Sequence, residues 1–261
     1  MLLAHNDLGA SQHVVVVTGA GSGLGRALAI EFTERNIIVV GLGRRRDALD
    51  ETARLTKDGL FVGKTADIGD PRSVAMIFDQ IHEEFGAVTI LINNAAVYPR
   101  IDFLRETCSE FMDAVAVNLG GVVACTKAAL SSMTLTGRGR IINVGSFADL
   151  APQPVSAAYS VSKGAARILS QAIVADLSDR FPNIVLTTWM PGILATSMGR
   201  PDGLSPNTAA VWGVNLALLN DPTLNGAVFE KNLEILPGRS LKTRLLERLL
   251  LKPQKVARTL C

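Results

Sequence analysis

The sequence predicts a single doubly wound α/β domain, and three observations favour that fold class. Short runs of nearly continuous apolar residues recur along the chain, as in strands of a sheet that is covered on both faces. These runs alternate with segments long enough for helices, which indicates parallel connections. The chain has 261 residues, 48% of them hydrophobic, which suffices for one large core. No linker, repeat or low-complexity segment divides it.

The elements are expected to alternate along the chain. We predict strands at residues 13–18, 37–42, 60–66, 88–93, 140–145 and 184–189, and a weaker one at 227–230. Helices are predicted near residues 24–35, 45–57, 71–85, 107–135, 157–180 and 206–219. The result is a sheet of about seven mostly parallel strands with helices on both faces. Ligands of such sheets bind beyond the carboxyl ends of the strands, so the residues there are the functional candidates.

The first strand runs into a glycine-rich stretch, TGAGSGLG, at residues 18–25. Its glycines allow a tight turn and a close approach of the backbone to a pyrophosphate, while the next helix points its N-terminus at the phosphates. The spacing is TGxxxGxG instead of the GxGxxG fingerprint. A purely structural turn is the alternative, but the position after the first strand favours a Rossmann-type nucleotide site. The predicted contacts are Thr18, Gly19, Gly21, Ser22, Gly23, Leu24 and Gly25.

The end of the second strand bears on the choice of cofactor. A carboxylate there would bind a ribose 2′-hydroxyl and select NAD, but the corresponding position is Gly43. Arg44, Arg45 and Arg46 follow, and guanidinium groups suit a 2′-phosphate. The alternative is a solvated helix start, although basic residues at a helix N-terminus oppose its dipole. We therefore expect NADP(H) to be preferred over NAD(H), with Arg44 and Arg45 as contacts.

Polar residues also follow the third and fourth strands. Asp67, with Ile68 beside it, either reads an adenine edge or caps the next turn, and the sequence leaves both interpretations open. Asn93 and Asn94 need hydrogen-bond partners if they are buried. There are two alternatives: the asparagines form hydrogen bonds between the sheet and the following loop, or they contact the cofactor together with Ala95.

Ser146 follows the fifth strand, and the next helix carries Tyr159 and Lys163. Residues four apart are neighbours on a helix, and an ammonium beside a phenol lowers a pKa that is ordinarily about 10. Alternatively, Tyr159 packs on the lysine stem or both face solvent. Taken alone, the Tyr159–Lys163 pair favours packing or exposure to solvent over a functional role. A functional interpretation therefore depends on the residues that the rest of the chain places beside the pair. Asn118 lies within a long helical segment, where asparagine lowers helix propensity without an evident structural purpose.

The ordered set of motifs is similar to that of the short-chain dehydrogenase/reductase family. The resemblance covers roughly residues 12–230 and rests on motifs in the family's order. These motifs are the glycine turn, Asp67, NNAA at 93–96, Asn118, Ser146, YxxxK at 159–163 and Pro191–Gly192. YxxxK alone is a weak signal, but the ordered set is specific. The chain departs from the family where NNAG reads NNAA and where another sequence replaces the usual final strand and closing Gly-Gly.

The resemblance implies an NADP(H)-dependent oxidoreductase that reduces a ketone or aldehyde to an alcohol, or the reverse. It assigns Tyr159 the proton transfer, Ser146 a hydrogen bond to the substrate oxygen, and Asn118 a water that relays protons. Lys163 would keep Tyr159 acidic and hold the nicotinamide ribose. Tyr159, Lys163, Pro191, Gly192, Ile193 and Thr196 complete the expected cofactor contacts. The four catalytic positions of the family (Asn118, Ser146, Tyr159 and Lys163) are all present, which argues against the alternative of an NADP(H) sensor or interaction module. A nucleotide-sugar epimerase is a further alternative, but it would need a larger C-terminal domain.

The sequence does not identify the substrate or the physiological direction. The loop after Pro191–Gly192 is short, covering residues 193–204 before an expected helix start at Ser205–Pro206. Arg200 would meet an anionic substrate, but a surface arginine is the favoured interpretation. Sugars, steroids, acyl thioesters and xenobiotic ketones all remain open. Candidate lining residues are Tyr98, Phe147, Asp149, Leu150, Met190, Met198 and Arg200.

We divide the chain into a Rossmann-type domain at residues 1–238 and a basic amphipathic helical tail at 239–261. The tail has seven basic residues and one glutamate, a net charge of +6, which leaves −4 for the rest of a chain whose total is +2. Leucines after Ser240, a candidate N-cap, form one apolar stripe. Docking on the chain's own or a neighbouring subunit is favoured over an anionic membrane surface. Residues 252–261 are expected to form a polar, frayed end.

The remaining composition bears on partners and compartment. The 3 cysteines show no metal-type spacing and fit a reducing compartment, and the 3 histidines are scattered, so we expect no metal site. The nearly balanced charge gives no sign of nucleic acid binding. The first residues lack the pattern of a secretory signal, and no run of 18 apolar residues predicts a membrane span. We therefore expect a cytoplasmic protein.

The helix near residues 157–180 is rich in small side chains, which let helix backbones approach closely. In the family that the chain resembles, this helix and its neighbour near 119–135 form a four-helix dimer contact. Packing on the chain's own sheet is the alternative, but it needs only one small face. We therefore predict a homodimer or homotetramer that acts on a small-molecule carbonyl or alcohol substrate. The small residues are Ala157, Ala158, Ser160, Ser162, Gly164, Ala165 and Ala166.

Overall fold

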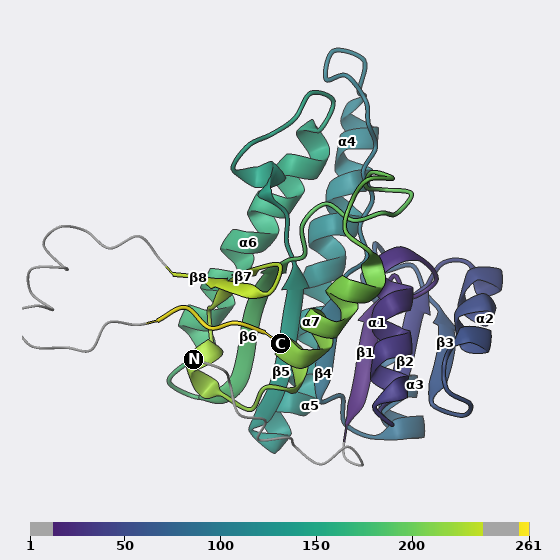
Figure 1. The fold of residues 1–261 in the computed structure, drawn as a ribbon, viewed down its shortest axis with the longest axis vertical. Coiled ribbons are helices and arrows are strands. Elements are labelled where there is room, and N and C mark those ends of the chain that lie inside the picture. The colour runs from purple at the N-terminus through teal and green to yellow at the C-terminus, as the bar shows by residue number, and fades with distance from the viewer. Residues whose placement is uncertain (1–12, 237–255, 261) are drawn as a thin grey trace, which may run out of the picture.

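The computed structural model describes residues 13–236 and 256–260. Within them, one sheet has the strand order β3-β2-β1-β4-β5-β6-β7-β8 (Figure 1). The strands are β1 (Val14–Thr18), β2 (Ile38–Gly43), β3 (Phe61–Thr65), β4 (Ile90–Asn93), β5 (Arg138–Val144), β6 (Asn183–Met190), β7 (Val228–Glu230) and β8 (Leu233–Ile235). All neighbours pair in parallel except β8, which is antiparallel to β7. The predicted doubly wound sheet is confirmed, and the short strand β8 is an addition to it.

The predicted helices are confirmed as well, with small shifts at their ends. They are α1 (Gly23–Glu34), α2 (Arg46–Leu55), α3 (Pro71–Phe85), α4 (Cys108–Val115), α5 (Gly121–Thr136), α6 (Ala157–Leu177) and α7 (Pro206–Leu218). Local signals fix several starts. The Asp70 side chain caps α3 ahead of Pro71, and Thr107 and Glu110 form a capping box at the start of α4.

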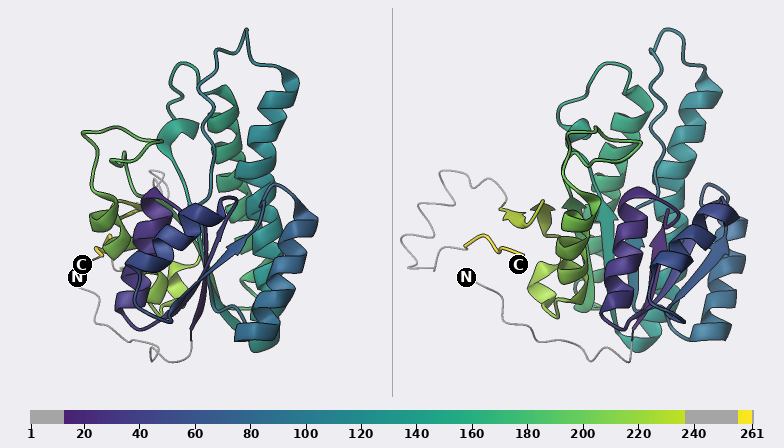
Figure 2. Two further views of the ribbon diagram at one scale, coloured as in Figure 1. Left: turned by 90° about the vertical axis from the view of Figure 1, so that its right-hand side faces the viewer. Right: turned by 45° about the vertical axis from the view of Figure 1, so that its right-hand side comes forward.

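Alternation of side chains along β1 divides the core into two layers. Val15 and Val17 pack into a cluster with α1 and α7. Val14 and Val16 point to the opposite face, where α3, α5 and α6 contribute the apolar residues. Figure 2 shows these helices on the two sides of the sheet. Because both faces are covered, the strands are apolar along almost their whole length.

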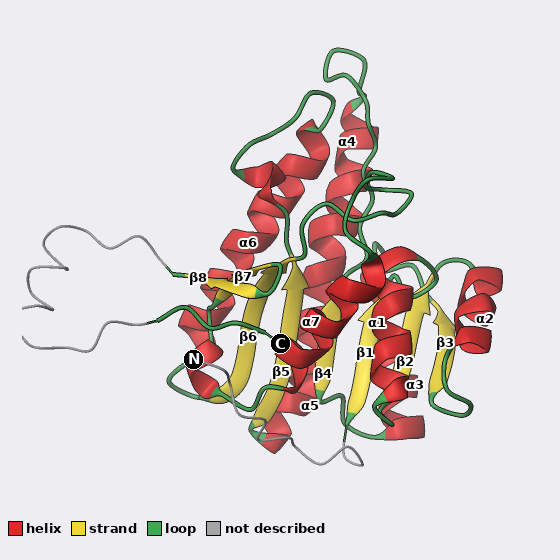
Figure 3. Cartoon of the chain, viewed as in Figure 1, coloured by secondary structure: helices red, strands yellow, loops and turns green. Residues whose placement is uncertain are grey.

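The strand order shows where a ligand site is expected in this fold. β1 pairs with both β2 and β4, so the order of the chain reverses there. In open α/β sheets, ligands bind at this switch point, outside the carboxyl ends of the strands. Figure 3 shows the arrowheads of β1, β5 and β6 directed toward one rim, where the connecting loops gather.

One helical stretch is unusually long. Cys108–Thr136 runs continuously through α4, a π-helical turn at Ala116–Gly120 and α5. By length and composition it could cross a membrane, although it holds no continuous run of 18 apolar residues. Here Cys125, Ala129 and Met133 of this stretch are buried against the sheet. The stretch therefore serves as a core helix of the α/β domain.

The C-terminal end returns to the sheet. Residues 256–260 are not helical, and they form an antiparallel bridge with β8. Leu260 is buried in the core, while Arg258 pairs with Glu234 at 3.6 Å. The expected polar, frayed end is therefore wrong for these residues, because Leu260 contributes buried apolar surface and Arg258 has acidic partners. The predicted leucine stripe at 241–249 lies outside the described residues.

Candidate active site

A cavity of about 810 Å³ opens at the carboxyl ends of the strands. This volume is typical of small-molecule and cofactor sites. The cavity extends from the glycine turn after β1 to Tyr159 of α6. Every residue predicted as catalytic or as a cofactor contact lines it except Thr18, Gly25 and Asn118.

The turn after β1 has the backbone shape that its glycines predict. Gly19 and Gly23 have φ values of 70° and 52°, in the left-handed region that favours glycine. A Cβ on Gly25 would lie 2.2 Å from the carbonyl oxygen of Gly19, so only glycine lets α1 approach the turn this closely. The N-terminus of α1 then faces the cavity, where helix N–H groups favour an anion. This cradle fits the pyrophosphate of a dinucleotide, and Gly25 contributes through packing instead of contact.

Thr18 organises the neighbouring loop from a buried position. Its hydroxyl oxygen accepts hydrogen bonds from the backbone N–H groups of Asn94 and Ala95, each at 3.0 Å. Asn94 Nδ2 donates to the carbonyl oxygen of Thr18 at 2.8 Å. Asn93 instead donates to Asn143 of β5 at 2.8 Å. Of the two asparagines, Asn93 therefore links β4 to β5 and Asn94 lines the cavity.

The three arginines after β2 separate into two groups. Arg44 and Arg45 are exposed and line the cavity. Arg46 donates to Asp50 at 2.9 Å and to the carbonyl oxygen of Gly63 at 3.3 Å. Arg44 and Arg45 therefore border this end of the cavity, while the guanidinium of Arg46 is engaged with α2 and β3.

Asp67 fits both of its interpretations. Its Oδ1 accepts the backbone N–H of Gly69 at 2.9 Å, a turn that aspartate stabilises. The residue also lines the cavity. Ile68 beside it is buried and leaves no room for a side chain on Gly121, where a Cβ would lie 2.7 Å from its Cδ1.

Asn118 is fully buried in the π-helical turn and does not line the cavity. Its Oδ1 accepts the backbone N–H of Val97 at 2.8 Å, and its Nδ2 donates to the Val97 carbonyl at 2.9 Å and to Ser162 at 3.0 Å. The amide therefore ties the loop after β4 to α6. This is the structural purpose that the sequence did not reveal, at a π-helical turn of the kind frequent at functional sites.

Tyr159 and Lys163 meet on α6, with the lysine Nζ 5.9 Å from the tyrosine ring centroid. Nζ donates to the carbonyl oxygen of Val144 at 2.8 Å, and burial lowers the pKa of Lys163 to about 8. Burial raises the pKa of Tyr159; a hydrogen bond with Ser146 opposes this shift, and Tyr98 adds to it. The prediction that Lys163 keeps Tyr159 acidic is therefore wrong for this structure, because desolvation disfavours the phenolate.

Ser146 begins a short 3₁₀ turn at Phe147–Asp149. Its Oγ accepts the backbone N–H of Ala148 at 3.1 Å, and its own O–H can donate to the Tyr159 oxygen, which is the hydrogen bond that opposes the rise in the pKa of Tyr159. The buried Asp149 side chain pairs with Arg167 of α6 and so fixes the turn to the helix that carries Tyr159. The predictions that Asp149 and Leu150 line the cavity are wrong: Asp149 is held by Arg167, and Leu150 is 63% exposed.

The loop after β6 folds back toward the glycine turn. A Cβ on Gly23 would lie 3.2 Å from Cγ2 of Thr196, so the two segments are close neighbours. Arg200 lines the cavity and pairs with Asp202 at 2.9 Å, both well exposed, as expected of a surface arginine. α7 starts at Pro206 as predicted, and the Ser205 side chain caps it.

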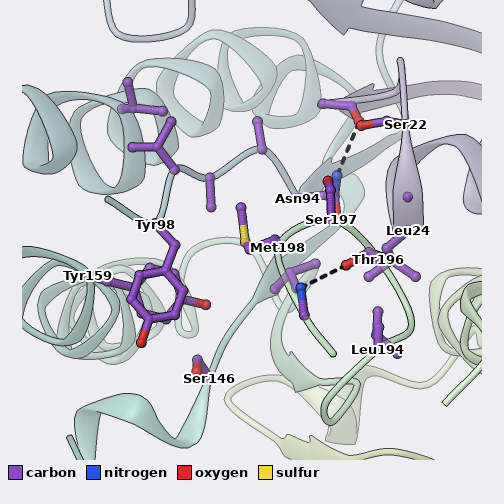
Figure 4. Close-up of a pocket in the computed structure, with 18 of the residues that line it drawn as sticks. Ser22, Leu24, Asn94, Tyr98, Ser146, Tyr159, Leu194, Thr196, Ser197 and Met198 are labelled. Atoms are coloured by element: carbon purple, nitrogen blue, oxygen red, sulfur yellow. Dashed lines mark hydrogen bonds between the residues drawn. The ribbon is translucent and has the colours of Figure 1, made fainter. Parts of the chain in front are cut away.

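Figure 4 shows a contact that the sequence did not reveal. The rings of Tyr98 and Tyr159 stack, with centroids 4.4 Å apart and 17° between their planes. The guanidinium of Arg100 lies 5.1 Å from the Tyr98 centroid, and its Nη2 donates to the carbonyl oxygen of Met198 at 2.8 Å. Tyr98 and Arg100 lie on the loop after β4, Tyr159 on α6 and Met198 on the loop after β6. No local pattern in the sequence could have brought these segments together. Arg100, Val97, Ala151 and Gln153 line the cavity without having been predicted.

Comparisons with known proteins agree with this geometry. A family described as short chain dehydrogenase matches residues 13–205. The 3alpha-hydroxysteroid dehydrogenase of Mediterraneibacter gnavus is 33% identical and covers 71% of this chain and 75% of its own. The NADP-dependent (R)-specific alcohol dehydrogenase of Lentilactobacillus kefiri is 32% identical, over 71% and 74%. A short chain dehydrogenase structure from Bacillus anthracis shares the fold with a TM-score of 0.78 at 21% identity, covering 85% of this chain and 95% of that one.

Proposed function

The chain belongs to the short chain dehydrogenase family, and we propose that it is an NADP(H)-dependent oxidoreductase that interconverts a ketone or aldehyde and an alcohol. One observation carries this proposal. A single cavity joins a dinucleotide cradle at one end to Ser146, Tyr159 and Lys163 at the other. Relatives named as hydroxysteroid, meso-2,3-butanediol and alcohol dehydrogenases support the same class of reaction.

The preference for NADP(H) rests on the end of β2. Arg44 and Arg45 line the cavity there without a carboxylate at Gly43, and guanidinium groups pair well with a phosphate. A relative that is named NADP-dependent supports this choice. When bound, the cofactor supplies or accepts the hydride, and the protein binds and orients it. Among the described residues, no cluster of histidine, cysteine or acidic side chains could hold a metal ion.

We assign the proton transfer to Tyr159. The raised pKa keeps its phenol protonated at neutral pH, which is the form that donates a proton to a carbonyl oxygen. General acid catalysis of this kind contributes about 10²–10⁴-fold. In the reverse direction the phenol must lose its proton, and the hydrogen bond with Ser146 is the contact that favours the phenolate. Burial of the ring limits the access of water to the reacting group.

The other polar residues hold this arrangement. When a substrate is bound, Ser146 can turn its O–H from Tyr159 to the substrate oxygen and stabilise the charge that develops there. Lys163 holds α6 to the end of β5 through the Val144 carbonyl. With its pKa lowered to about 8, Lys163 remains mostly protonated at neutral pH. Asn118 fixes the loop beside the site through Val97, and a proton relay through Asn118 stays a prediction.

We also propose a homo-oligomer. Ala158, Ser160 and Ala166 of α6 are buried within the chain, so packing on its own domain accounts for that face. The outer face carries Val161 and Ile168, which are 55% and 64% exposed. Apolar side chains on the outside of a helix favour a protein contact. The cytoplasmic location is likewise a proposal.

Steady-state oxidation of NADPH with a panel of ketones and aldehydes tests the activity. We expect turnover of at least one compound and slower turnover with NADH. If NADPH binds but no compound oxidises it, and no alcohol reduces NADP⁺, the chain is a binding protein and the proposal fails.

A further inference from the structure

Ser146 lies between two points at which the segment after β5 is attached to α6. Before it in the chain, the carbonyl oxygen of Val144 accepts a hydrogen bond from Nζ of Lys163 at 2.8 Å. After it, the Asp149 carboxylate pairs with Nε of Arg167. Both attachments therefore end on the helix that carries the proposed proton donor.

The helix presents these contacts from one face. Tyr159, Lys163 and Arg167 are spaced four residues apart, so they follow one another along a single face of α6. Gly164 permits a close approach, since a Cβ there would lie only 3.3 Å from the Cβ of Asp149. The 3₁₀ turn after β5 therefore packs directly against the helix face that carries the proton donor.

The ion pair between Asp149 and Arg167 is the last attachment before an exposed loop, because residues 150–155 are all exposed. The Asp149 side chain itself is 2% exposed, and its Oδ1 has no hydrogen-bond partner among the described residues. The carboxylate therefore depends on Arg167. An ion pair with a buried carboxylate adds little net stability, because desolvation offsets the attraction of the charges. The position that the pair fixes is therefore the better explanation for it.

We infer that Arg167, acting through Asp149, is a positioning residue that holds the hydroxyl of Ser146 beside the proton donor and the substrate oxygen. This inference rests on the proposed oxidoreductase function and deepens it. Neither Asp149 nor Arg167 lines the cavity, so neither acts on substrate or cofactor directly. Without the pair, the turn loses its second attachment to α6, and the Ser146 hydroxyl loses its fixed place beside the Tyr159 oxygen.

The double variant Asp149→Ala/Arg167→Met tests this inference, because it breaks the pair without leaving an unpaired buried charge. With NADPH and a ketone or aldehyde that the wild-type protein reduces, kcat should fall at least about tenfold, since a misplacement of 1 Å can cost about 100-fold. The Kd for NADPH should change less than about threefold, because the pair does not line the cavity. Arg167→Lys keeps a cation for Asp149 and should retain kcat within about threefold of wild type.

A Ser146→Ala background separates positioning from a merely structural effect. In that background, the double replacement should lower kcat by less than about twofold, because the group that the pair positions is already gone. Arg35→Met is the matched control: Arg35 pairs with Glu31 at the end of α1 away from the cavity, and its side chain is 30% exposed, against 32% for Arg167. The kcat of this control should stay within about twofold of wild type.

A titration of Tyr159 gives a readout that needs no substrate. In a Tyr98→Phe background, tyrosinate absorbance reports Tyr159 alone. The double replacement removes both charges of the pair together and leaves Lys163, the other titratable group at this ring, unchanged. The midpoint should rise, because Ser146 is no longer held where it donates to the phenolate.

A wild-type kcat or an unchanged midpoint in the double variant overturns the inference. An equal fall in kcat with and without Ser146 overturns it too, because the pair then acts through another group. Absence of turnover with every carbonyl compound in the wider panel refutes the oxidoreductase function itself, and the midpoint then still decides whether the pair positions Ser146.

Discussion

The two ends of the cavity are built in different ways. At the cofactor end, the contacts follow directly after β1, β2 and β3, and much of the cradle is backbone at Gly19 and Gly23. At the substrate end, Tyr159 depends on side chains from separate loops, with Tyr98 stacked on it and Arg100 joined to the loop after β6. The cofactor end is therefore largely a property of the fold, whereas the substrate end is a property of particular side chains.

The strongest way to break the cofactor end alone is Gly25→Ala. Its Cβ would lie 2.2 Å from the Gly19 carbonyl oxygen, so α1 or the turn must shift. We expect the Kd for NADPH to rise roughly 100-fold, about 2.7 kcal/mol. Gly120→Ala is the matched control, because nothing lies within 4 Å of a Cβ there. Calorimetry with both folded variants checks this, and unchanged binding to Gly25→Ala would show that the turn is not the cradle.

The difference between the cofactor end and the substrate end of the cavity also explains which features could be predicted from the sequence. The strands, the helices and the glycine turn follow from apolar periodicity and local spacing, so these predictions hold almost residue for residue. The positions of Arg44 and Arg45 in the lining of the cavity were predictable because both residues directly follow a strand. The Tyr98 stack was not, since it depends on how the loop after β4 folds over α6.

Two further features could not be predicted for the same reason. The role of Asn118 depends on Val97, which is distant in sequence and is brought near by the packing of α6 and the π-helical turn. The pKa of Tyr159 was expected to fall because spacing shows that Lys163 is a neighbour. Spacing does not show how deeply the ring is buried, and burial decides the direction of the shift.

A smaller effect sharpens the view of the cofactor end. Replacing both Arg44 and Arg45 by alanine should weaken NADPH binding at least tenfold, about 1.4 kcal/mol, with little change for NADH. Arg46→Ala is the control, because its side chain is engaged with Asp50 and Gly63. Gly43→Asp should shift the preference toward NADH, since a Cβ at that position makes only an ordinary contact at 3.4 Å. Equal losses for both cofactors in the double variant would show that the arginines do not recognise the 2′-phosphate.

The smallest predicted effect is a titration at the substrate end. Tyr98→Phe leaves Tyr159 as the one tyrosine of the chain, so ultraviolet absorbance of tyrosinate reports this group alone. Without cofactor, the midpoint should lie above the ordinary value of about 10, because burial raises the pKa. The folded state then holds the proton more tightly than the unfolded state. The resulting stability is present below about pH 10 and is lost as the pH rises through the folded pKa. A midpoint below 10 would show that burial does not decide the direction of the shift.

The central claim is that Tyr159 protonates a carbonyl group beside a bound NADP(H). Its most direct test is the kcat of Tyr159→Phe with NADPH and a ketone or aldehyde that the wild-type protein reduces, measured together with the Kd for NADPH. We predict a fall in kcat of about 10²–10⁴-fold with the Kd changed less than about threefold, because the phenol donates the proton and the dinucleotide cradle lies elsewhere. A variant that binds NADPH normally and keeps more than about a tenth of the wild-type kcat would contradict the account.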